Sequence, residues 1–290
     1  MDRLDAMEIL VAAVEAGSLS AASRRLEVPL ATVSRKISDL EAHLKTRLLT
    51  RSRTRLTPTE AGAAYLASAR RILEQVGEAE RAAAGEFSTP RGELAITAPI
   101  VFGRLHLLPV VSDFLAAYPE IDVRLSLSDR NAHLADDPFD LALRIGALPD
   151  SSLIAVRLGE LRRLVCASPA WLKTNGTPKK PADLAGKNAI TFGGSWTFGH
   201  GETVAVHERL VVNTAEAAVD AAIAGLGITR VLSYQAALAV AAKTLRIVLA
   251  EFEPERLPVH LLRAEQGMLP AKTRAFIDFA VPRLKKVLHS

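Results

Sequence analysis

Basic and hydroxylated side chains gather on one face of a helix that the sequence predicts after Val28-Pro29. Proline is tolerated in a first helical turn, where no backbone hydrogen bond is lost, so the helix can begin directly after it. An apolar stripe with intervals of four and three residues marks the buried face: Val33, Ile37, Leu40 and Leu44. The opposite face and its flank carry small, hydroxylated and basic side chains: Ala31, Thr32, Arg35, Ser38 and Ala42. An arginine in that position could form two hydrogen bonds with guanine in a DNA major groove.

Three arginines at alternate positions follow this helix: Arg51, Arg53 and Arg55. In an extended strand or wing they would point to one side and reach phosphates or a minor groove. The segment 24–55 holds nine basic and three acidic residues, although the whole chain has a formal net charge of only +4. A solvated basic surface would be the simpler interpretation of an isolated arginine run. The neighbouring helix pattern favours DNA binding instead.

Two shorter elements must position the candidate reading helix. A first amphipathic helix is expected to end near Gly17. Either Ser18 or Ser20 can cap the next helix, over residues 21–26, by accepting hydrogen bonds from its free backbone N–H groups. The resulting pattern of helix, tight turn and helix is typical of DNA-binding proteins.

A long helix is predicted after the arginines. Thr57-Pro58-Thr59-Glu60 has the pattern of a capping box, with Thr57 as N-cap and Pro58 at the first helical position. The helix should extend to about Gly85. Its small and apolar residues form a heptad seam: Gly62, Tyr65, Ala69, Ile72, Val76, Ala79 and Ala83.

This seam could pack on its own domain or on the same helix of a second copy of the chain. Dimerisation is favoured, because a DNA-reading helix usually needs a two-fold partner to cover two half-sites. The residues predicted to contact the partner helix are Tyr65, Ala69, Ile72 and Val76.

The chain changes character beyond the segment 87–92, which is predicted to be a hinge or linker. Strands are predicted at 94–97, 123–127, 141–145, 164–167, 189–192, 204–212, 227–231, 245–248 and 259–262. Helices are predicted at 105–118, 214–224 (with Asn213 as a candidate N-cap), 234–242 and 272–288. Alternating strands and helices indicate an α/β fold with mostly parallel sheets.

Composition excludes several classes of protein. A chain of 290 residues is too long for one small core, so two or more domains are expected. Its one cysteine, Cys166, excludes an intrachain disulfide bond and lies in an apolar run typical of a buried, inert thiol. The seven histidines show no metal-ligand spacing, so neither a metal nor a cofactor is expected. No signal peptide or membrane span is predicted, and the simplest location is the cytoplasm.

The sequence resembles the LysR-type family of bacterial transcriptional regulators along nearly its whole length. The matching motifs are Gly17-Ser18-Leu19-Ser20-Ala21-Ala22, Val33-Ser34-Arg35-Lys36-Ile37, Leu40-Glu41, Arg47-Leu48-Leu49-Thr50-Arg51, Leu56-Thr57-Pro58-Thr59-Glu60-Ala61-Gly62, Tyr118-Pro119-Glu120, Asp140-Leu141-Ala142-Leu143-Arg144-Ile145-Gly146 and Ala224-Gly225-Leu226-Gly227-Ile228.

The resemblance implies a winged helix–turn–helix domain over 1–59, a linker and dimerisation helix over 60–89, and an effector-binding domain over 90–290. The effector domain would resemble a periplasmic binding protein, with lobe I over about 90–161 and 267–290 and lobe II over about 162–266. It implies a homo-oligomer, dimer or tetramer, that binds double-stranded DNA and a small metabolite and contacts RNA polymerase. No enzymatic activity is expected, because no phosphate loop, nucleophile motif or metal cluster is present.

The predicted DNA contacts follow from the helix faces and the resemblance together: Ser20, Leu30, Ala31, Thr32, Ser34, Arg35, Ser38, Arg51, Arg53 and Arg55. The turn departs from the family pattern. Pro29-Leu30-Ala31-Thr32 stands where many members have Ser-Gln-Pro-Ala, so the N-cap serine is replaced and the DNA sequence recognised is expected to differ.

An effector site is expected beyond the carboxyl ends of the strands, where open α/β sheets bind ligands. The candidates are Ala98, Pro99, Ile100, Val101, Ser128, Arg144, Gly146, Phe192, Gly194 and Thr229. Arg144 could pair with a carboxylate effector or form a structural ion pair with Asp129 or Asp140.

Overall fold

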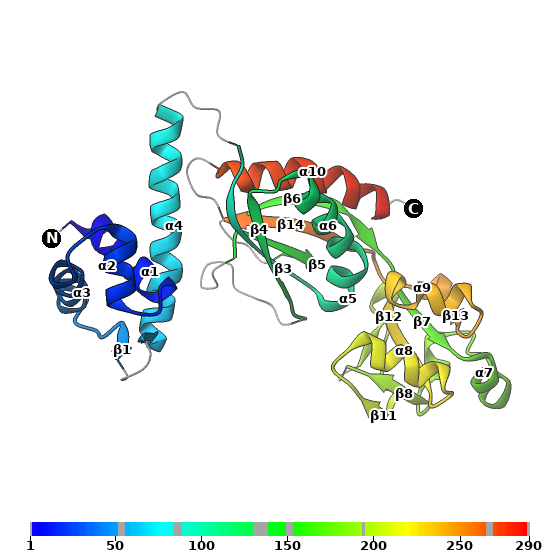
Figure 1. Cartoon of the computed structure of the whole chain (residues 1–290). Helices are drawn as coiled ribbons and strands as arrows, with labels where there is room; N and C mark the ends of the chain where they lie inside the picture. The colour runs from blue at the N-terminus through cyan, green and yellow to red at the C-terminus, as the bar shows by residue number, and fades with distance from the viewer. Residues whose placement is uncertain are drawn as a thin grey trace. The chain divides into compact units, whose positions relative to one another are not determined.

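The computed structural model describes residues 2–51, 56–83, 89–129, 139–148, 153–192, 195–264 and 269–288. The chain forms two compact units, Met1–Thr89 and Pro90–Ser290, which are described separately below (Figure 1).

The N-terminal unit contains four helices and a short β-ribbon. Its elements are α1 (Arg3–Glu15), α2 (Leu19–Leu26), α3 (Leu30–Leu44), β1 (Leu49–Arg51), β2 (Leu56–Pro58) and α4 (Glu60–Ala83). The hydroxyl of Ser18, rather than that of Ser20, caps α2 by accepting from the Ala21 backbone N–H at 3.1 Å. Helix α3 begins directly after Pro29, as predicted.

The core of this unit holds α3 by the predicted apolar stripe. Val33, Ile37 and Leu40 are fully buried, and Leu44 packs against the same cluster. Burying each of these side chains contributes about 1.5–3 kcal/mol. Because Ile9 and Leu10 of α1 lie in the same cluster, α3 is held firmly with its other face outward.

The β-ribbon is tied to both neighbouring helices. Strands β1 and β2 pair antiparallel, and Glu41 on α3 accepts from the backbone N–H groups of Leu48 (2.7 Å) and Leu49 (3.1 Å). The predicted cap of α4 is wrong, because Thr57 and Pro58 are extended in β2. Helix α4 begins at Glu60, and the hydroxyl of Thr59 accepts from the Gly62 N–H at 2.9 Å.

Lobe I of the C-terminal unit is a five-stranded mixed sheet in the order β4-β3-β5-β14-β6. The strands are β3 (Gly92–Ala98), β4 (Ile121–Leu127), β5 (Leu141–Ile145), β6 (Leu153–Leu161) and β14 (Leu257–Ala264). Strand β3 is parallel to β4 and β5, whereas β14 is antiparallel to β5 and β6. Its helical elements are α5 (Ile100–Phe102), the π-helical turn Gly103–Leu107, α6 (Leu108–Ala117) and α10 (Ala271–Leu288).

Lobe II is a second five-stranded mixed sheet in the order β11-β8-β12-β7-β13. Its sheet strands are β7 (Arg163–Ala167), β8 (Asn188–Thr191), β11 (His207–Val211), β12 (Ile228–Leu232) and β13 (Arg246–Val248). The longer helices are α7 (Pro169–Asn175), α8 (Ala215–Ile223) and α9 (Ser233–Ala241). Short 3-10 turns at Pro181–Leu184, Gly199–Gly201 and Ala250–Phe252 and the small ribbon β9 (Trp196–Thr197) with β10 (Thr203–Val204) complete it.

Four sequence expectations for this unit are corrected. The sheets are mixed rather than mostly parallel, because β14 in lobe I and β7 in lobe II run against their neighbours. Strand β14 belongs to the lobe I sheet, so the predicted extent of lobe II to residue 266 is wrong. The strand predicted over 204–212 is interrupted between β10 and β11, and Thr214, not Asn213, caps α8 by accepting from the Ala217 N–H.

The chain passes between the lobes twice, from β6 into β7 through Arg162 and back from lobe II into β14. Within the described residues, the helical segment Ile100–Ala117 is long and apolar enough, by length and composition alone, to cross a membrane. Phe102, Leu107 and Phe114 of this segment are fully buried in the lobe I core, which accounts for its apolar composition.

Candidate DNA-binding surface and effector crevice

The outward face of α3 presents the residues that the sequence analysis placed there. Ala31, Arg35 and Ser38 are exposed, Thr32 and Ser34 are half-buried, and Ser20 on α2 is exposed. Leu30, at the start of α3, leaves 46% of its surface exposed. An exposed leucine on an otherwise polar face is suited to an apolar contact such as a thymine methyl group.

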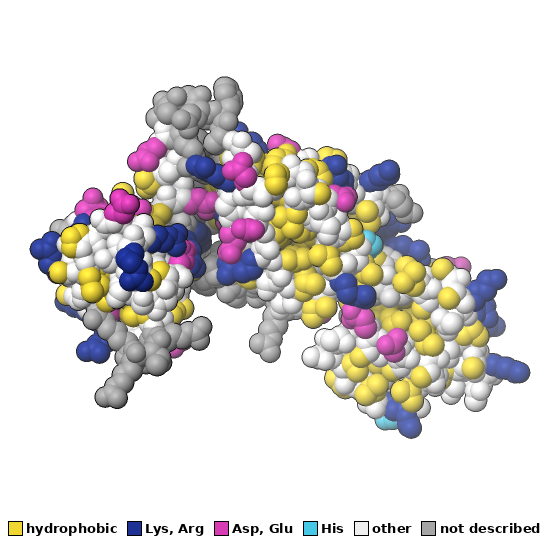
Figure 2. All heavy atoms as spheres, viewed as in Figure 1, with side chains coloured by type: hydrophobic (Ala, Val, Ile, Leu, Met, Phe, Trp, Pro, Cys, Tyr) yellow, Lys and Arg dark blue, Asp and Glu magenta, His cyan; other side chains and the backbone are white. Residues whose placement is uncertain are grey.

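Several nearby basic residues form ion pairs with carboxylates, whereas Arg35 has none among the residues that the structure describes. Lys36 forms an ion pair with Asp5, and Arg25 contacts Glu15 at 3.0 Å. Among the described residues no carboxylate lies within ion-pair distance of Arg35. Basic and acidic side chains share the surface of this unit, as Figure 2 shows. The charge of Arg35 is therefore available to an external partner.

The arginines after α3 are only partly within the described residues. The backbone of Arg51 lies in β1, which gives the predicted wing its first strand. The side chain of Arg51 and the whole of Arg53 and Arg55 lie outside the described residues. Their contacts with DNA stay predictions.

The predicted seam on α4 is divided between two environments. Gly62 and Ala69 are buried within the single chain, and Tyr65 packs partly on the N-terminal core. The prediction that Ala69 contacts a partner helix is therefore wrong, because its side chain has no exposed surface. Ile72 is 37% exposed and Val76 is half-buried, so the second half of the seam keeps surface for a partner.

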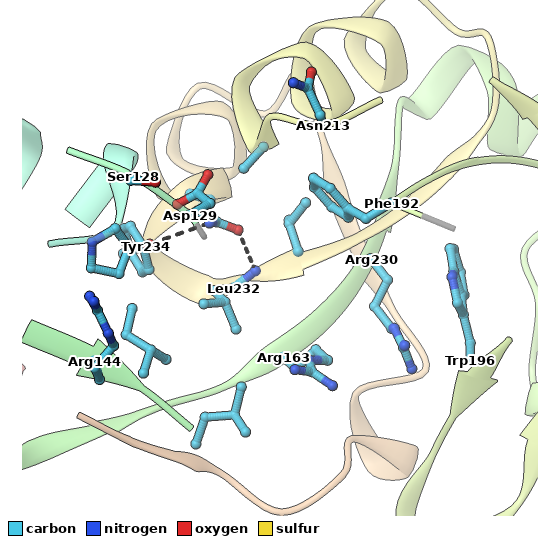
Figure 3. Close-up of a pocket in the computed structure, with 16 residues that line it drawn as sticks. Ser128, Asp129, Arg144, Arg163, Phe192, Trp196, Asn213, Arg230, Leu232 and Tyr234 are labelled. Carbon is cyan, nitrogen blue, oxygen red and sulfur yellow. Dashed lines mark hydrogen bonds between the residues drawn. The ribbon is translucent and has the colours of Figure 1, made fainter. Parts of the chain in front are cut away.

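A crevice of about 390 Å³ lies between lobes I and II (Figure 3). Four of the predicted effector residues line it: Pro99, Ser128, Arg144 and Phe192. Phe192 is 47% exposed, and Figure 3 shows its ring directed into the crevice. Because residues of both lobes share the lining, a bound molecule would contact both.

Other predicted effector residues lie elsewhere. Ala98 and Val101 are buried, and the Ile100 N–H donates to the Asp129 carboxylate at 3.0 Å. Thr229 is fully buried and donates to the carbonyl oxygen of Ile190 at 3.0 Å. Gly146 has φ +113° and does not line the crevice, and Gly194 lies outside the described residues. The side chains of Ala98, Val101 and Thr229 do not line the crevice, and Thr229 lies near the start of β12 rather than at its carboxyl end.

The structure adds lining residues that the predicted set lacked. The polar ones are Asp129, Arg163, Asn213, Arg230, Tyr234 and Gln235, and the indole of Trp196 joins them. A usable signal existed for two of them, because Arg163 and Arg230 are charged residues at or within short apolar strands. A charge in such a strand is costly unless it faces a cavity or a partner.

The Arg144 side chain forms a hydrogen bond with the backbone of its own strand, and the choice between an effector and a structural ion pair stays a prediction. Its guanidinium donates to the carbonyl oxygen of Leu143 at 2.9 Å. Asp129 accepts from the Ile100 N–H and Asp140 from the Ala95 N–H at 2.8 Å, so backbone groups engage both carboxylates.

Arg163 and Arg230 give the lobe II wall its charge. The Arg230 guanidinium lies 5.3 Å from the Trp196 ring centroid and donates to the Thr197 carbonyl oxygen at 2.9 Å. Burial and the neighbouring charge of Arg163 lower the pKa of Arg230 to about 10, and burial also lowers the pKa of Arg163. Both groups remain charged at neutral pH.

Tyr234 on α9 connects the two lobes at the crevice. Its ring packs edge-on against Phe102 (5.4 Å) and His106 (5.6 Å) of lobe I. The Gln235 amide donates to its hydroxyl at 3.3 Å and accepts from the Leu232 N–H at 2.8 Å. Burial raises the pKa of Tyr234, so the hydroxyl stays protonated and can donate to a ligand.

The two units match two family models. Residues 4–63 match that of bacterial regulatory helix-turn-helix proteins of the lysR family, and residues 88–285 match that of the LysR substrate binding domain. The chain belongs to the LysR family of transcriptional regulators.

Full-length relatives agree with this assignment. The chain is 36% identical to an HTH-type transcriptional regulator of Xanthomonas campestris pv. campestris, covering 95% of this chain and 84% of the relative. It is 35% identical to an HTH-type transcriptional repressor of Pseudomonas aeruginosa, covering 97% and 92%. The structure of CrgA, a LysR-type transcriptional regulator from Neisseria meningitidis, matches with a TM-score of 0.62 and 29% identity, covering 97% and 98%.

The LysR family consists of transcriptional regulators rather than enzymes, and its helix–turn–helix implies DNA binding. In this member the helix–turn–helix match contains α2, α3 and the described β-ribbon, and the substrate-binding match contains all the residues that line the crevice. Among the described residues no group of three His, Cys, Asp or Glu side chains could hold a metal ion. Cys166 is fully buried, and burial raises its pKa to about 12.

Proposed function

We propose that this LysR-family chain is a homo-oligomeric transcription factor that reads operator DNA with α3 and responds to a small molecule bound between the lobes. The exposed face of α3 carries the first half of the proposal. Arg35 has no ion-pair partner among the described residues, and the helix that presents it is fixed by three fully buried side chains.

The DNA contacts are proposed for exposed and half-buried positions of α2 and α3 together with the wing. The helix residues are Ser20, Leu30, Ala31, Thr32, Ser34, Arg35 and Ser38. The wing residues are Arg51, Arg53 and Arg55. Arg35 would read a base edge, while the wing arginines would contact phosphates or a minor groove without choosing a sequence.

The crevice supports the second half of the proposal. A ligand that contacts Arg144 on lobe I and Phe192 on lobe II would favour one angle between the lobes. Because a ligand shifts an equilibrium toward the state it binds more tightly, it would change the spacing of paired reading helices. This change would alter DNA bending or contact with RNA polymerase.

The proposed assembly is a dimer or tetramer in the cytoplasm, joined partly through the exposed residues of α4. Two-fold pairing would let two copies of α3 cover adjacent half-sites one helical turn apart. Ile72 and Val76 supply the apolar surface for such a contact.

A footprint on the DNA upstream of the chain's own gene tests this function. The experiment uses wild type, Arg35→Ala, and Arg209→Ala, which removes an equal charge at an exposed site in lobe II. We expect a two-fold protected region with wild type and the control, and a change in its extent with one product of the neighbouring genes. Absence of protection at moderate salt would contradict the proposal. Measuring transcription from the same DNA fragment shows whether the protein activates or represses the gene.

A further inference from the structure

Two arginines of lobe II lie side by side on one face of its sheet. Strands β7 and β12 pair antiparallel, with Arg230 opposite Val165 and Leu232 opposite Arg163. Residues two apart on a strand share a face, so Arg163 and Arg230 are diagonal neighbours on the same face. Both line the crevice, and Figure 3 shows them on the same side of it, with Trp196 next to Arg230.

These two charges have no carboxylate partner in the described structure. Both side chains are half-buried, and no described carboxylate lies within ion-pair distance of either. The Arg230 guanidinium instead contacts an aromatic ring and a backbone carbonyl oxygen. Two half-buried cations that also repel each other are unfavourable unless an anion compensates them.

The charges that line the crevice differ between its walls. Among the described lining residues, lobe I contributes Arg144 and Asp129, whose formal charges cancel. The described lining of lobe II contributes Arg163 and Arg230 and no acidic side chain. An anionic group that enters the crevice is therefore attracted mainly to the lobe II wall.

We propose that Arg163 and Arg230 bind the oxyanion of an organic acid, with the apolar part of that molecule against the ring of Phe192. This inference deepens the proposed function, because it names the chemical class of the effector and the groups that recognise it.

The surrounding contacts make the site selective for such a molecule. A guanidinium presents parallel N–H donors that match the oxygens of a carboxylate or phosphate. Trp196 and the Thr197 carbonyl oxygen hold the Arg230 guanidinium in one orientation before a ligand arrives. A volume of about 390 Å³ admits a molecule larger than an inorganic ion, and the exposed Phe192 ring offers it an apolar surface.

Thermal unfolding of the full-length chain with four probes tests the inference. The probes are benzoate, phenyl phosphate, neutral benzamide and inorganic phosphate, each in a concentration series at constant ionic strength. We expect benzoate or phenyl phosphate to raise the Tm by about 2–5 °C at the highest concentration, because a ligand that binds only the folded state stabilises it. Benzamide has the same ring without the charge and should leave the Tm unchanged.

Variants separate the arginine pair from general salt effects. Arg163→Gln and Arg230→Gln should lose the shift, while Arg209→Gln, which removes an equal charge from an exposed lobe II site, should keep it. Arg163→Lys retains the positive charge but lacks the two parallel N–H donors, so it should keep a smaller Tm shift. Such a shift would also show that position 163 tolerates substitution. Circular dichroism confirms that each variant folds.

The outcomes distinguish the ligand chemistry and the two proposals. A shift with benzoate alone indicates a carboxylate, and one with phenyl phosphate alone indicates an organic phosphate. If no oxyanion probe stabilises wild type more than Arg163→Gln and Arg230→Gln, the anion site is overturned. A footprint that still responds to a metabolite in both Gln variants would overturn the anion site and leave the proposed function intact.

Discussion

Arg162 and Glu253 form a bidentate salt bridge between the two passages of the chain that connect the lobes. The Arg162 Nε donates to Glu253 Oε2 at 2.8 Å, and Nη2 donates to Oε1 at 2.7 Å. The hydrogen bond to Glu253 raises the pKa of Arg162. Since Arg162 joins β6 to β7 and Glu253 precedes the return into β14, this pair ties the two connecting passages to each other.

A double-mutant cycle should reveal this coupling. In urea unfolding, Arg162→Gln and Glu253→Gln should show a coupling free energy of about 1 kcal/mol, because the geometry is bidentate although Arg162 is partly exposed to solvent. Arg162→Gln should cost more, because it leaves the carboxylate of Glu253, only 14% exposed, without its partner. The exposed pair Arg157–Glu160 is the matched control and should show almost no coupling. Equal coupling free energies in the two pairs would show that Arg162–Glu253 is no stronger than an exposed ion pair.

The reading helix makes a prediction about base preference. Arg35→Ala should weaken operator binding by roughly 1–3 kcal/mol and relax the preference at one base pair, because a two-bond contact with a base edge is lost. Fluorescence anisotropy with the operator and its single-base variants measures both effects. Arg209→Ala is the charge-matched control. Unchanged operator affinity in Arg35→Ala would show that α3 is placed wrongly.

Much of the fold could be predicted from local patterns. The α3 stripe, the strand Leu141–Ile145 and the positions of α8 and α9 follow from periodicity and turn residues within one segment. The start of α4 could not be predicted in the same way. Thr57 and Pro58 fit a helix cap locally, but pairing with β1 holds them extended, and that partner lies outside the motif.

The crevice was predicted less completely because its lining depends on the side of the sheet toward which each side chain points. Ala98 and Thr229 stand at or near the expected strand ends, yet both side chains are fully buried. Arg230 is the next residue after Thr229 and faces the opening, since neighbouring residues on a strand point to opposite sides. Strand β14 follows a segment of lobe II and pairs in lobe I, a long-range contact that no local pattern contains.

Replacing Gly62 by alanine should lower the stability of the protein, although this substitution usually stabilises a helix. A Cβ at this position would lie 1.9 Å from the backbone oxygen of Leu48, where β1 approaches α4. Gly62→Ala should therefore destabilise the chain by roughly 1–3 kcal/mol, whereas Gly77→Ala in the same helix should stabilise it by about 0.5–1 kcal/mol. Urea unfolding followed by circular dichroism compares the two. A stabilising Gly62→Ala would show that α4 and β1 are not in close contact.

The buried thiol makes a prediction about reactivity. Cys166 is fully buried, and its pKa of about 12 leaves about one thiolate in ten thousand at pH 8. The native chain should therefore resist iodoacetamide at pH 8, and urea-unfolded chain should take up one label. Mass spectrometry counts the labels in both states. Rapid labelling of the native chain would contradict the burial of Cys166 and the inert role assigned to it.

The exposed half of the α4 seam predicts where a dimer can be broken. Ile72→Glu places a charge on an apolar position that is 37% exposed in the single chain, so the variant should fold yet lose its partner. Ala64→Glu adds the same charge at an exposed position away from the seam and should remain associated. Sedimentation velocity measures the assembly, and thermal unfolding confirms that both variants fold. Dissociation of Ala64→Glu with an intact Ile72→Glu assembly would place the interface on the flank of α4 that carries Ala64.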